Sequence, residues 1–149
     1  MSNTIYWDKL RILVTNSCNY RCPFCHNEGQ VSRKTIKTMD FDKFKILIDA
    51  VKDEGISEIC FSGGEPFLDK NLIEMIRYAY RNAEWEVCCA SNLSLITKEQ
   101  VQQLADIPLK FNIQFPYTKA KKFHQSTGNG FIDKIITKSK LLVSSIIYA

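Results

Sequence analysis

Four short apolar segments recur along the 149-residue chain, and each has the length and composition of a buried β-strand. They are rich in Ile, Val, Phe and other residues that favour strands, and polar residues, glycine or proline follow them. The four segments are residues 10–15 (LRILVT), 56–62 (ISEICFS), 85–90 (WEVCCA) and 109–115 (LKFNIQF), the last of which is stopped by Pro116.

Apolar residues at helical spacing occupy the intervals between these strands. The predicted helices are residues 41–51 with Asp40 as the N-cap and Gly55 as the stop, residues 72–82 with Asp69 or Asn71 as the N-cap, a helix that begins at the capping box of Thr97 and Gln100, and a helix from residue 131 onward. Residues 30–38 and 116–130 are predicted to form loops, and the final apolar residues fit either the end of the last helix or a further strand.

This alternation predicts an α/β fold of about four βα units, with a parallel sheet, right-handed crossovers and helices on the outer face of the sheet. Ligands bind at the C-terminal ends of the strands in such folds. Four residues would converge there, namely Cys18, Gly63, Asn92 and Gln114. The last two fit equally well as ordinary turn residues at strand ends.

The first strand is followed by three cysteines, Cys18, Cys22 and Cys25, in a C-x3-C-x2-C spacing. Thiolates clustered in this way hold iron–sulfur clusters, and three of them leave one iron of a four-iron cluster open to another ligand. A helix that buries the three cysteines on one face is an alternative, but Asn16, Pro23 and other residues of this stretch disfavour a helix. Disulfide-bonded cysteines and structural zinc are further alternatives, and zinc would need a fourth ligand.

The second strand ends in the sequence SGGEP at residues 62–66. Paired glycines after a strand allow close approach of the backbone, and they leave amide and carbonyl groups free to bind a polar ligand. Taken alone, the pair Gly63-Gly64 is more often an ordinary turn. Its combination with the three cysteines is more informative.

Together the two motifs resemble those of the radical S-adenosylmethionine (radical SAM) superfamily, and the surrounding residues look most like the branch that includes the molybdenum-cofactor biosynthesis enzyme MoaA. The resemblance runs from about residue 10 to the C-terminus. It rests on the three cysteines, on the aromatic Phe24 before the third of them, on the SGGEP sequence, and on the order of strands and helices between the motifs. The combination is specific, whereas either motif alone is not.

The resemblance implies a [4Fe–4S] cluster on the three cysteines, with S-adenosylmethionine bound to the fourth iron through its amino and carboxylate groups. It implies that residues 62–65 contact the methionine amino group. The implied cofactor-binding residues are Phe24, Ser62, Gly63, Gly64, Glu65, Asn92 and Gln114. In such enzymes an electron from the reduced cluster cleaves the cofactor, and the resulting 5′-deoxyadenosyl radical abstracts a hydrogen atom from the substrate.

The chain departs from the family pattern in its number of βα units, because members usually have six and four are predicted here. We therefore expect residues 1–149 to be the N-terminal part of one radical SAM core domain, as an incomplete fragment or as a short protein that covers its open sheet edge by forming a homodimer. The expected enzyme acts on a small-molecule or peptide substrate and receives electrons from a flavodoxin- or ferredoxin-like donor. A non-catalytic iron–sulfur fragment and an activating enzyme for glycyl radical proteins are the alternatives.

Composition narrows the picture further. No apolar stretch is long enough to span a membrane and residues 1–9 do not resemble a signal peptide, so we expect a cytoplasmic protein with reduced cysteines. The net charge of +4 is weak, and no nucleic-acid-binding module is evident. A small basic group is interpreted as a solvated face; its members are Lys119, Lys121 and Lys122.

The remaining cysteines and the two histidines are secondary candidates. Cys60, Cys88 and Cys89 lie in predicted strands. The adjacent Cys88 and Cys89 would point to opposite faces of their strand, so we interpret these two as packing residues rather than ligands of a second cluster. His26 either tunes the cluster or forms a hydrogen bond within the loop. His124 has no predicted role.

Overall fold

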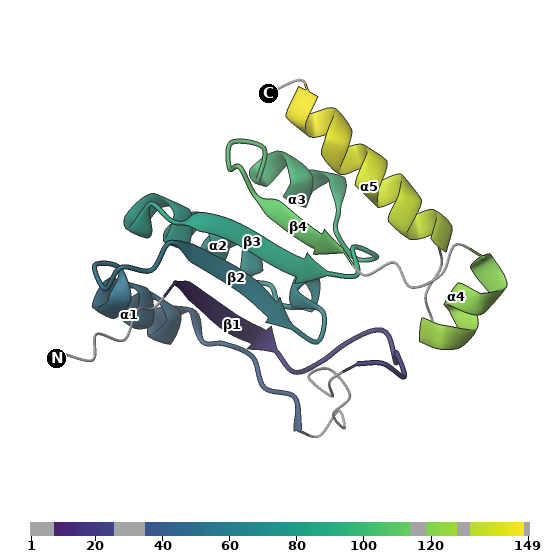
Figure 1. Ribbon diagram of the computed structural model, residues 1–149, viewed down its shortest axis with the longest axis horizontal. Helices are drawn as coiled ribbons and strands as arrows, with labels where there is room; N and C mark the ends of the chain where they lie inside the picture. Colours follow the sequence, from purple (N-terminus) through teal and green to yellow (C-terminus); the bar gives the residue numbers. More distant parts are fainter. Residues whose placement is uncertain (1–7, 26–34, 114–118, 128–131, 148–149) are drawn as a thin grey trace, which may run out of the picture.

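A computed structural model describes residues 8–25, 35–113, 119–127 and 132–147 of the chain. Its sheet contains four strands, which are β1 (Lys9–Thr15), β2 (Glu58–Gly63), β3 (Glu86–Ser91) and β4 (Lys110–Ile113). All neighbouring pairs are parallel, and the strands lie in chain order across the sheet. Figure 1 shows the four arrowheads at the same end of the sheet. The predicted α/β fold with a four-stranded parallel sheet is therefore confirmed.

The helices are α1 (Phe41–Val51), α2 (Leu72–Ala83), α3 (Lys98–Gln103), α4 (Ala120–Thr127) and α5 (Ile132–Ile147), with a short 3₁₀ helix, η2 (Pro66–Leu68), before α2. Helices α1, α2 and α3 begin next to the predicted capping residues, whereas no cap was predicted for α4 or α5. Asp40 caps α1 by accepting a hydrogen bond from the Lys43 amide at 2.9 Å, and Thr97 and Gln100 form the capping box of α3. Before α2, the Asp69 carboxylate accepts a hydrogen bond from the Asn71 amide at 2.7 Å, and Asn71 makes no side-chain cap of its own.

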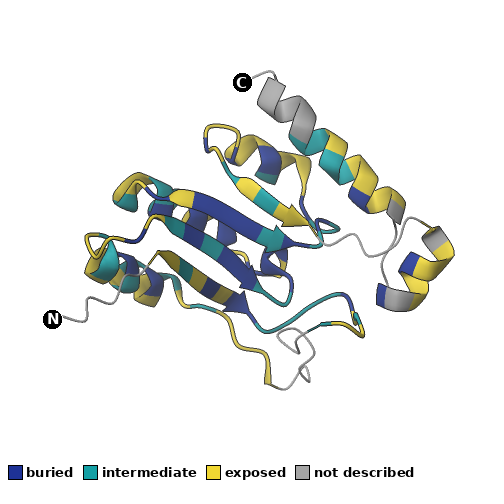
Figure 2. Cartoon of the chain, in the orientation of Figure 1, coloured by how far each residue is buried: buried dark blue, intermediate teal, exposed yellow. Residues whose placement is uncertain are grey.

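The hydrophobic core lies between one face of the sheet and the helices α1, α2 and α3. Alternate residues of the strands point into it, as the two-residue period of a strand requires, and Phe61 of β2 contacts Phe44 of α1 with ring centroids 5.8 Å apart. Figure 2 shows the central strands β2 and β3 mostly buried, whereas exposed residues interrupt the outer strands. The intervening residues form the opposite face of the sheet, which we call the inner face; it comprises Lys9, Arg11, Leu13, Glu58, Cys60, Ser62, Glu86, Cys88, Ala90, Lys110 and Asn112.

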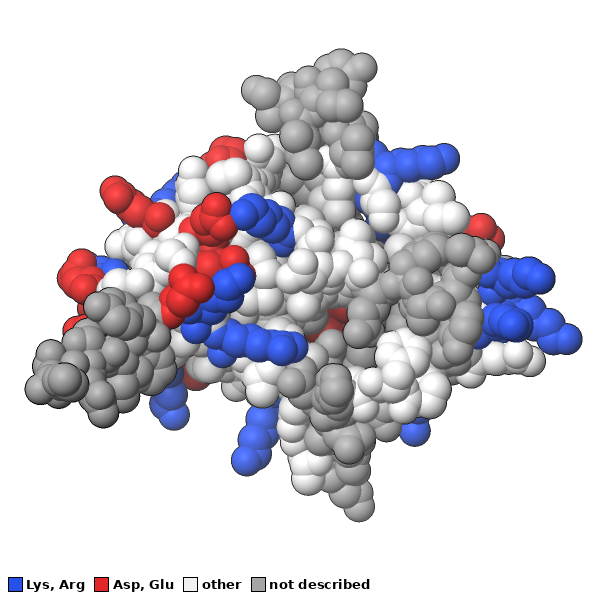
Figure 3. All heavy atoms as spheres, viewed as in Figure 1, with Lys and Arg blue, Asp and Glu red and all other residues white. Residues whose placement is uncertain are grey.

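Charged residues of the inner face gather at the N-terminal ends of the strands, where Figure 3 shows acidic and basic side chains side by side. Lys9 bonds Glu58 at 3.1 Å, and Lys110 bonds Glu86 at 2.6 Å. These pairs lie at the surface, so each contributes little to stability. The motif residues lie at the other end of the sheet, at the C-terminal ends of the strands.

Two predictions for the C-terminal third need correction or completion. The segment 116–130 is not a continuous loop, because residues 120–127 form α4. Its buried Phe123 packs against Tyr20 and Ile135, which gives this short helix an apolar contact. Helix α5 runs to Ile147, so the apolar residues up to that position continue a helix and not a strand. None of the helices in the described ranges has the length and hydropathy of a membrane-spanning segment.

Candidate cofactor site

The three motif cysteines lie on a non-helical stretch that leaves the C-terminal end of β1, as predicted. We call residues 16–25 the cysteine loop. The loop is held by local hydrogen bonds, since the Cys25 amide donates to the Cys22 carbonyl at 3.0 Å and the Tyr20 amide donates to Cys18 Sγ at 3.3 Å. The first of these bonds closes a tight turn between two of the cysteines.

The glycine pair at the end of β2 is bonded directly to the start of this loop. The Gly64 amide donates to the Thr15 carbonyl, and the Glu65 amide donates to the Ser17 carbonyl, both at 2.8 Å. A Cβ atom on Gly63 would overlap the Thr15 carbonyl oxygen, and one on Gly64 would overlap the Ser17 carbonyl oxygen. Gly63 also has a φ of +140°, which side chains disfavour. Only glycine permits the two backbones to approach so closely.

Glu65 lies beneath the site and joins the ends of β2 and β3. Its side chain is fully buried. Oε1 accepts hydrogen bonds from the Phe67 amide at 3.1 Å and from Ser91 Oγ at 2.7 Å, and Oε2 accepts one from the Asn92 amide at 2.8 Å. Burial raises the pKa of the Glu65 carboxyl, while the three hydrogen bonds act in the opposite direction. The carboxylate therefore organises the backbone around the site.

Asn92 connects the end of β3 to the cysteine loop. Its Nδ2 donates to Asn19 Oδ1 at 2.9 Å, and its Oδ1 accepts hydrogen bonds from the Ser94 amide and hydroxyl at 2.9 and 2.7 Å. Asn19 Nδ2 in turn donates to Ser94 Oγ at 2.8 Å. This closed set of polar contacts fixes the position of the loop relative to the third strand.

A cleft of about 420 Å³ opens between these elements, within the size range of small-molecule sites. It is lined by most of the residues that the sequence singled out, which are Cys18, Cys22, Phe24, Cys25, Ser62, Gly63, Gly64 and Asn92. Glu65 is not part of this lining, because its side chain is turned into the protein. Gln114 and His26 lie outside the described residues.

Arg11 of β1 is a cleft residue that the sequence reasoning missed. It lies on the inner face, and its Nη2 donates to Ser62 Oγ at 2.7 Å. The signal that could have found it is the strand alternation, because Arg11 interrupts an apolar strand two residues before Leu13 on the face away from the core. It brings a positive charge to the floor of the cleft.

The thiols are partly buried in the free chain. Burial is the main cause that raises the pKa of Cys18 to about 11, and burial also raises the pKa of Cys22. Within the described ranges, no three His, Cys, Asp or Glu side chains form a group that could hold one metal ion. The three thiols thus line a common cleft without converging on a single point.

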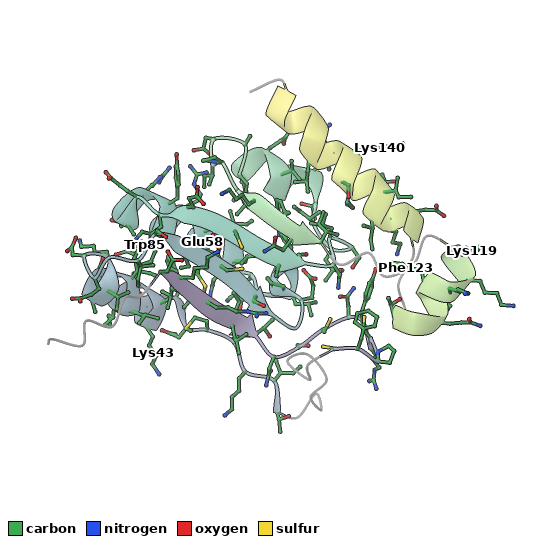
Figure 4. All side chains as sticks on the ribbon, viewed as in Figure 1. Lys43, Glu58, Trp85, Lys119, Phe123 and Lys140 are labelled. Carbon is green, nitrogen blue, oxygen red and sulfur yellow. The ribbon has the colours of Figure 1, made fainter. Side chains whose placement is uncertain are left out.

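Helices α4 and α5 cover one side of the cysteine loop. Tyr20 and Phe123 meet edge to face with ring centroids 6.4 Å apart, and they form an apolar cluster with Ile135 against which Cys18 and Cys22 pack. Figure 4 shows Phe123 pointing from α4 toward the loop. The Arg21 amide also donates to the carbonyl of Thr127, the last residue of α4, at 2.8 Å. Sequence reasoning missed this cover because it predicted a loop here.

A parallel α/β sheet with three thiols and a glycine-lined backbone cradle at its carboxyl edge defines a cofactor-binding domain with soft metal-ligand chemistry. The comparison with known families is specific on this point, because the model of the radical SAM superfamily matches residues 12–145. The chain belongs to that superfamily.

Curated relatives include enzymes named GTP 3′,8-cyclase. The protein of Clostridium perfringens is 28% identical over 134 residues, covering 87% of this chain and 41% of the relative, and that of Hydrogenovibrio crunogenus is 30% identical over 138 residues, covering 87% and 40%. A PqqA peptide cyclase of Bradyrhizobium diazoefficiens is 30% identical over 96 residues, covering 64% of this chain and 25% of the relative. The chain spans about two fifths of the length of the first two relatives.

Solved structures share the fold at low sequence identity. SuiB of Streptococcus suis bound to its precursor peptide SuiA matches with a TM-score of 0.81 and 19% identity, covering 94% of this chain and 31% of that one. The enzyme anSMEcpe with bound AdoMet matches with a TM-score of 0.73 and 18% identity, covering 93% and 41%. Both likenesses show that the four βα units are arranged as in larger proteins of this fold.

Proposed function

We propose that the chain is the N-terminal part of a radical SAM core, in which Cys18, Cys22 and Cys25 hold a [4Fe–4S] cluster beside bound S-adenosylmethionine. The observation that carries the proposal is the direct bonding of the two motifs, because the amides of Gly64 and Glu65 donate to carbonyls at the start of the cysteine loop. The three thiols and the backbone of Gly63 and Gly64, which we call the glycine cradle, thereby share one cleft.

The donor set fits a cluster. Thiolate is the ligand that iron–sulfur clusters use, and each thiolate of a cluster binds a different iron, so three thiols that line one cleft fit this donor set. When bound and reduced, the cluster would supply the electron that cleaves S-adenosylmethionine to a 5′-deoxyadenosyl radical, which abstracts a hydrogen atom from the substrate.

In this proposal the residues of the chain bind and orient S-adenosylmethionine and hold the cysteine loop in place. Ser62 and the cleft-lining backbone of Gly63 and Gly64 offer hydrogen-bonding groups to the polar end of S-adenosylmethionine, and Phe24, which is 39% exposed, offers an apolar surface at the cleft. Asn92 holds the loop in position through Asn19. The apolar side chains of Tyr20, Phe123 and Ile135 exclude water from one side of the thiols.

We propose a small-molecule or peptide substrate for the complete enzyme. Relatives named as cyclases of GTP and of a peptide support both classes, and three of the similar structures hold peptides. The proposed electron donor is flavodoxin- or ferredoxin-like. The proposed homodimer would form along β4, the last strand of the described sheet.

The test is an anaerobic reconstitution with iron and sulfide, followed by reduction and addition of S-adenosylmethionine. We expect the visible absorbance of an iron–sulfur cluster, a change of its electron paramagnetic resonance signal on addition of the cofactor, and formation of 5′-deoxyadenosine. A cluster without the other two results would favour a non-catalytic fragment.

Two cysteine variants test which cysteines bind the cluster. Cys22→Ala should lose the cluster absorbance, whereas Cys60→Ser, which changes a cysteine outside the loop, should keep it. Retention of wild-type iron by the Cys22 variant would overturn the assignment.

A further inference from the structure

Two cysteines outside the proposed cluster site lie opposite each other on neighbouring strands. Cys60 of β2 and Cys88 of β3 are partners in the parallel register, and alternation places both on the inner face. Parallel strands lie about 4.8 Å apart, which falls within the Cα separation that a disulfide requires, about 4.4–6.8 Å. The backbone thus holds the two thiols at bridging distance.

The two sulfur atoms also lie close together. Cys88 Sγ donates to Cys60 Sγ with the sulfur atoms 2.7 Å apart, and Asn112 Nδ2 donates to Cys88 Sγ at 3.4 Å. A disulfide needs a sulfur separation of about 2.05 Å, so the two atoms would have to approach by only about 0.7 Å. Cys89, the neighbour of Cys88 in sequence, points to the other face into the hydrophobic core and has no such partner among the described contacts.

We propose that Cys60 and Cys88 form a redox-active dithiol that closes to a reversible disulfide across β2 and β3. Burial, with a smaller effect of the Cys60 hydrogen bond, raises the pKa of Cys88 to about 12, which keeps Cys88 as the thiol donor. Cys60 is the more exposed of the two and receives this hydrogen bond, so it is the sulfur that attacks. Exposed disulfides are among the labile and regulatory ones, and Cys60 is only partly buried.

The oxidant in this reaction is a small disulfide molecule. The Cys60 thiolate attacks one of its sulfur atoms, which forms a mixed disulfide and releases one small thiolate. Cys88 then loses its proton and attacks Cys60 Sγ, which forms the protein disulfide and releases the second small thiolate. Two electrons pass from the protein thiols to the oxidant, and two protons leave the protein to give two small thiols.

The position of the pair gives the reaction a consequence for the site. Figure 4 labels Glu58 at the start of β2; Cys60 follows on the same face, and Ser62 of the cleft is the next residue on that face. A covalent link between the strands therefore restrains the strand segment that leads into the glycine cradle. The inference rests on the strand register and does not depend on a cluster in the cysteine loop.

The experiment treats the full chain anaerobically with 2-hydroxyethyl disulfide, traps the remaining thiols, and maps the tryptic peptides by mass spectrometry. Cleavage after lysine and arginine separates peptide 53–70, whose only cysteine is Cys60, from peptide 82–98, which contains Cys88 and Cys89. We expect these two peptides to be linked, and the link to be lost on addition of excess 2-mercaptoethanol.

Three matched serine variants locate the bond and its direction. Cys89→Ser should keep the link. Cys88→Ser should lose it and accumulate the small thiol on Cys60, and Cys60→Ser should leave Cys88 unmodified. A wild-type chain in which Cys60 stays reduced, carries only the small thiol, or pairs with a loop cysteine would overturn the proposal. The cluster assay reports separately, because it follows iron bound to different cysteines.

Discussion

Glu65 provides the sharpest test of how the site is built, because its carboxylate faces three donors and no acceptor. Oε1 accepts hydrogen bonds from the Phe67 amide and the Ser91 hydroxyl, and Oε2 accepts one from the Asn92 amide. Replacing Glu65 by Gln keeps the size and shape but turns one acceptor oxygen into an NH₂ group. If the Gln carbonyl takes the Oε1 position, its NH₂ group meets the Asn92 amide, and two donors face each other.

The structure gives the size of this effect. The variant loses one hydrogen bond to a charged acceptor, worth about 1.5–3 kcal/mol, and it leaves the part-buried Asn92 N–H without its acceptor at an overlapping cost of about 1–3 kcal/mol. Relief from burying a charge offsets part of this loss. We expect the free energy of unfolding to fall by about 3 kcal/mol, and at an m value of about 2 kcal/mol/M this lowers the urea midpoint by about 1.5 M.

The assay is urea unfolding at neutral pH, followed by far-ultraviolet circular dichroism. Glu58→Gln is the matched control, because it makes the same chemical change at the start of β2, the strand that precedes Glu65, at a residue that pairs with Lys9. The control should change the midpoint far less. A loss in the Glu65 variant no larger than the roughly 0.5 kcal/mol typical of surface substitutions would refute the three-bond role of the carboxylate.

Three further predictions follow from the same geometry. Because burial raises the pKa of Glu65 above its ordinary 4.5, the native carboxyl ionises at a higher pH than the unfolded one, so wild-type stability should fall as pH rises from about 4.5 through the native pKa and then level off, and Glu65→Gln should remove that slope in urea titrations. Gly64→Ala should lower the unfolding free energy by about 3 kcal/mol and reduce cluster loading. The control Gly55→Ala, in open space at a φ of +81°, should cost only about 1 kcal/mol and leave loading unchanged. Phe123→Ala should cost about 3 kcal/mol and expose Tyr20, measured as faster amide exchange in the cysteine loop.

The strands and most helices could be predicted because their signals are local. A run of β-branched and aromatic residues marks a strand, and Asp40 or Thr97 marks a helix start through contacts within three residues. Helix α4 lacked such a signal. Phe123 is its one buried large apolar side chain among those described, and its contact with Tyr20 lies about a hundred residues away in the sequence. The pattern therefore indicated a loop.

The candidate site also has parts that local sequence signals predict and parts that they do not. The cysteine and glycine motifs can be recognised from residue type and spacing, and the structure places most of the predicted residues in one cleft. The role of Glu65 could not be predicted, because its partners Ser91 and Asn92 belong to the end of another strand. The pairing of Cys60 with Cys88 was equally hidden, since it depends on the register of two strands and a shift by one residue would separate the thiols.

The register also explains why two motifs some forty residues apart form one site. The pairing of β1 with β2 shifts between Leu13 and Thr15, so that Thr15 lies opposite Gly63 at the carboxyl edge. This shift accompanies the bond between the Thr15 carbonyl and the Gly64 amide, and the loop and the cradle therefore leave the sheet at the same level. Because backbone atoms make that junction, it does not depend on the side chains of cleft residues such as Phe24 and Arg11. Any side chain at Gly64 would instead break the junction itself.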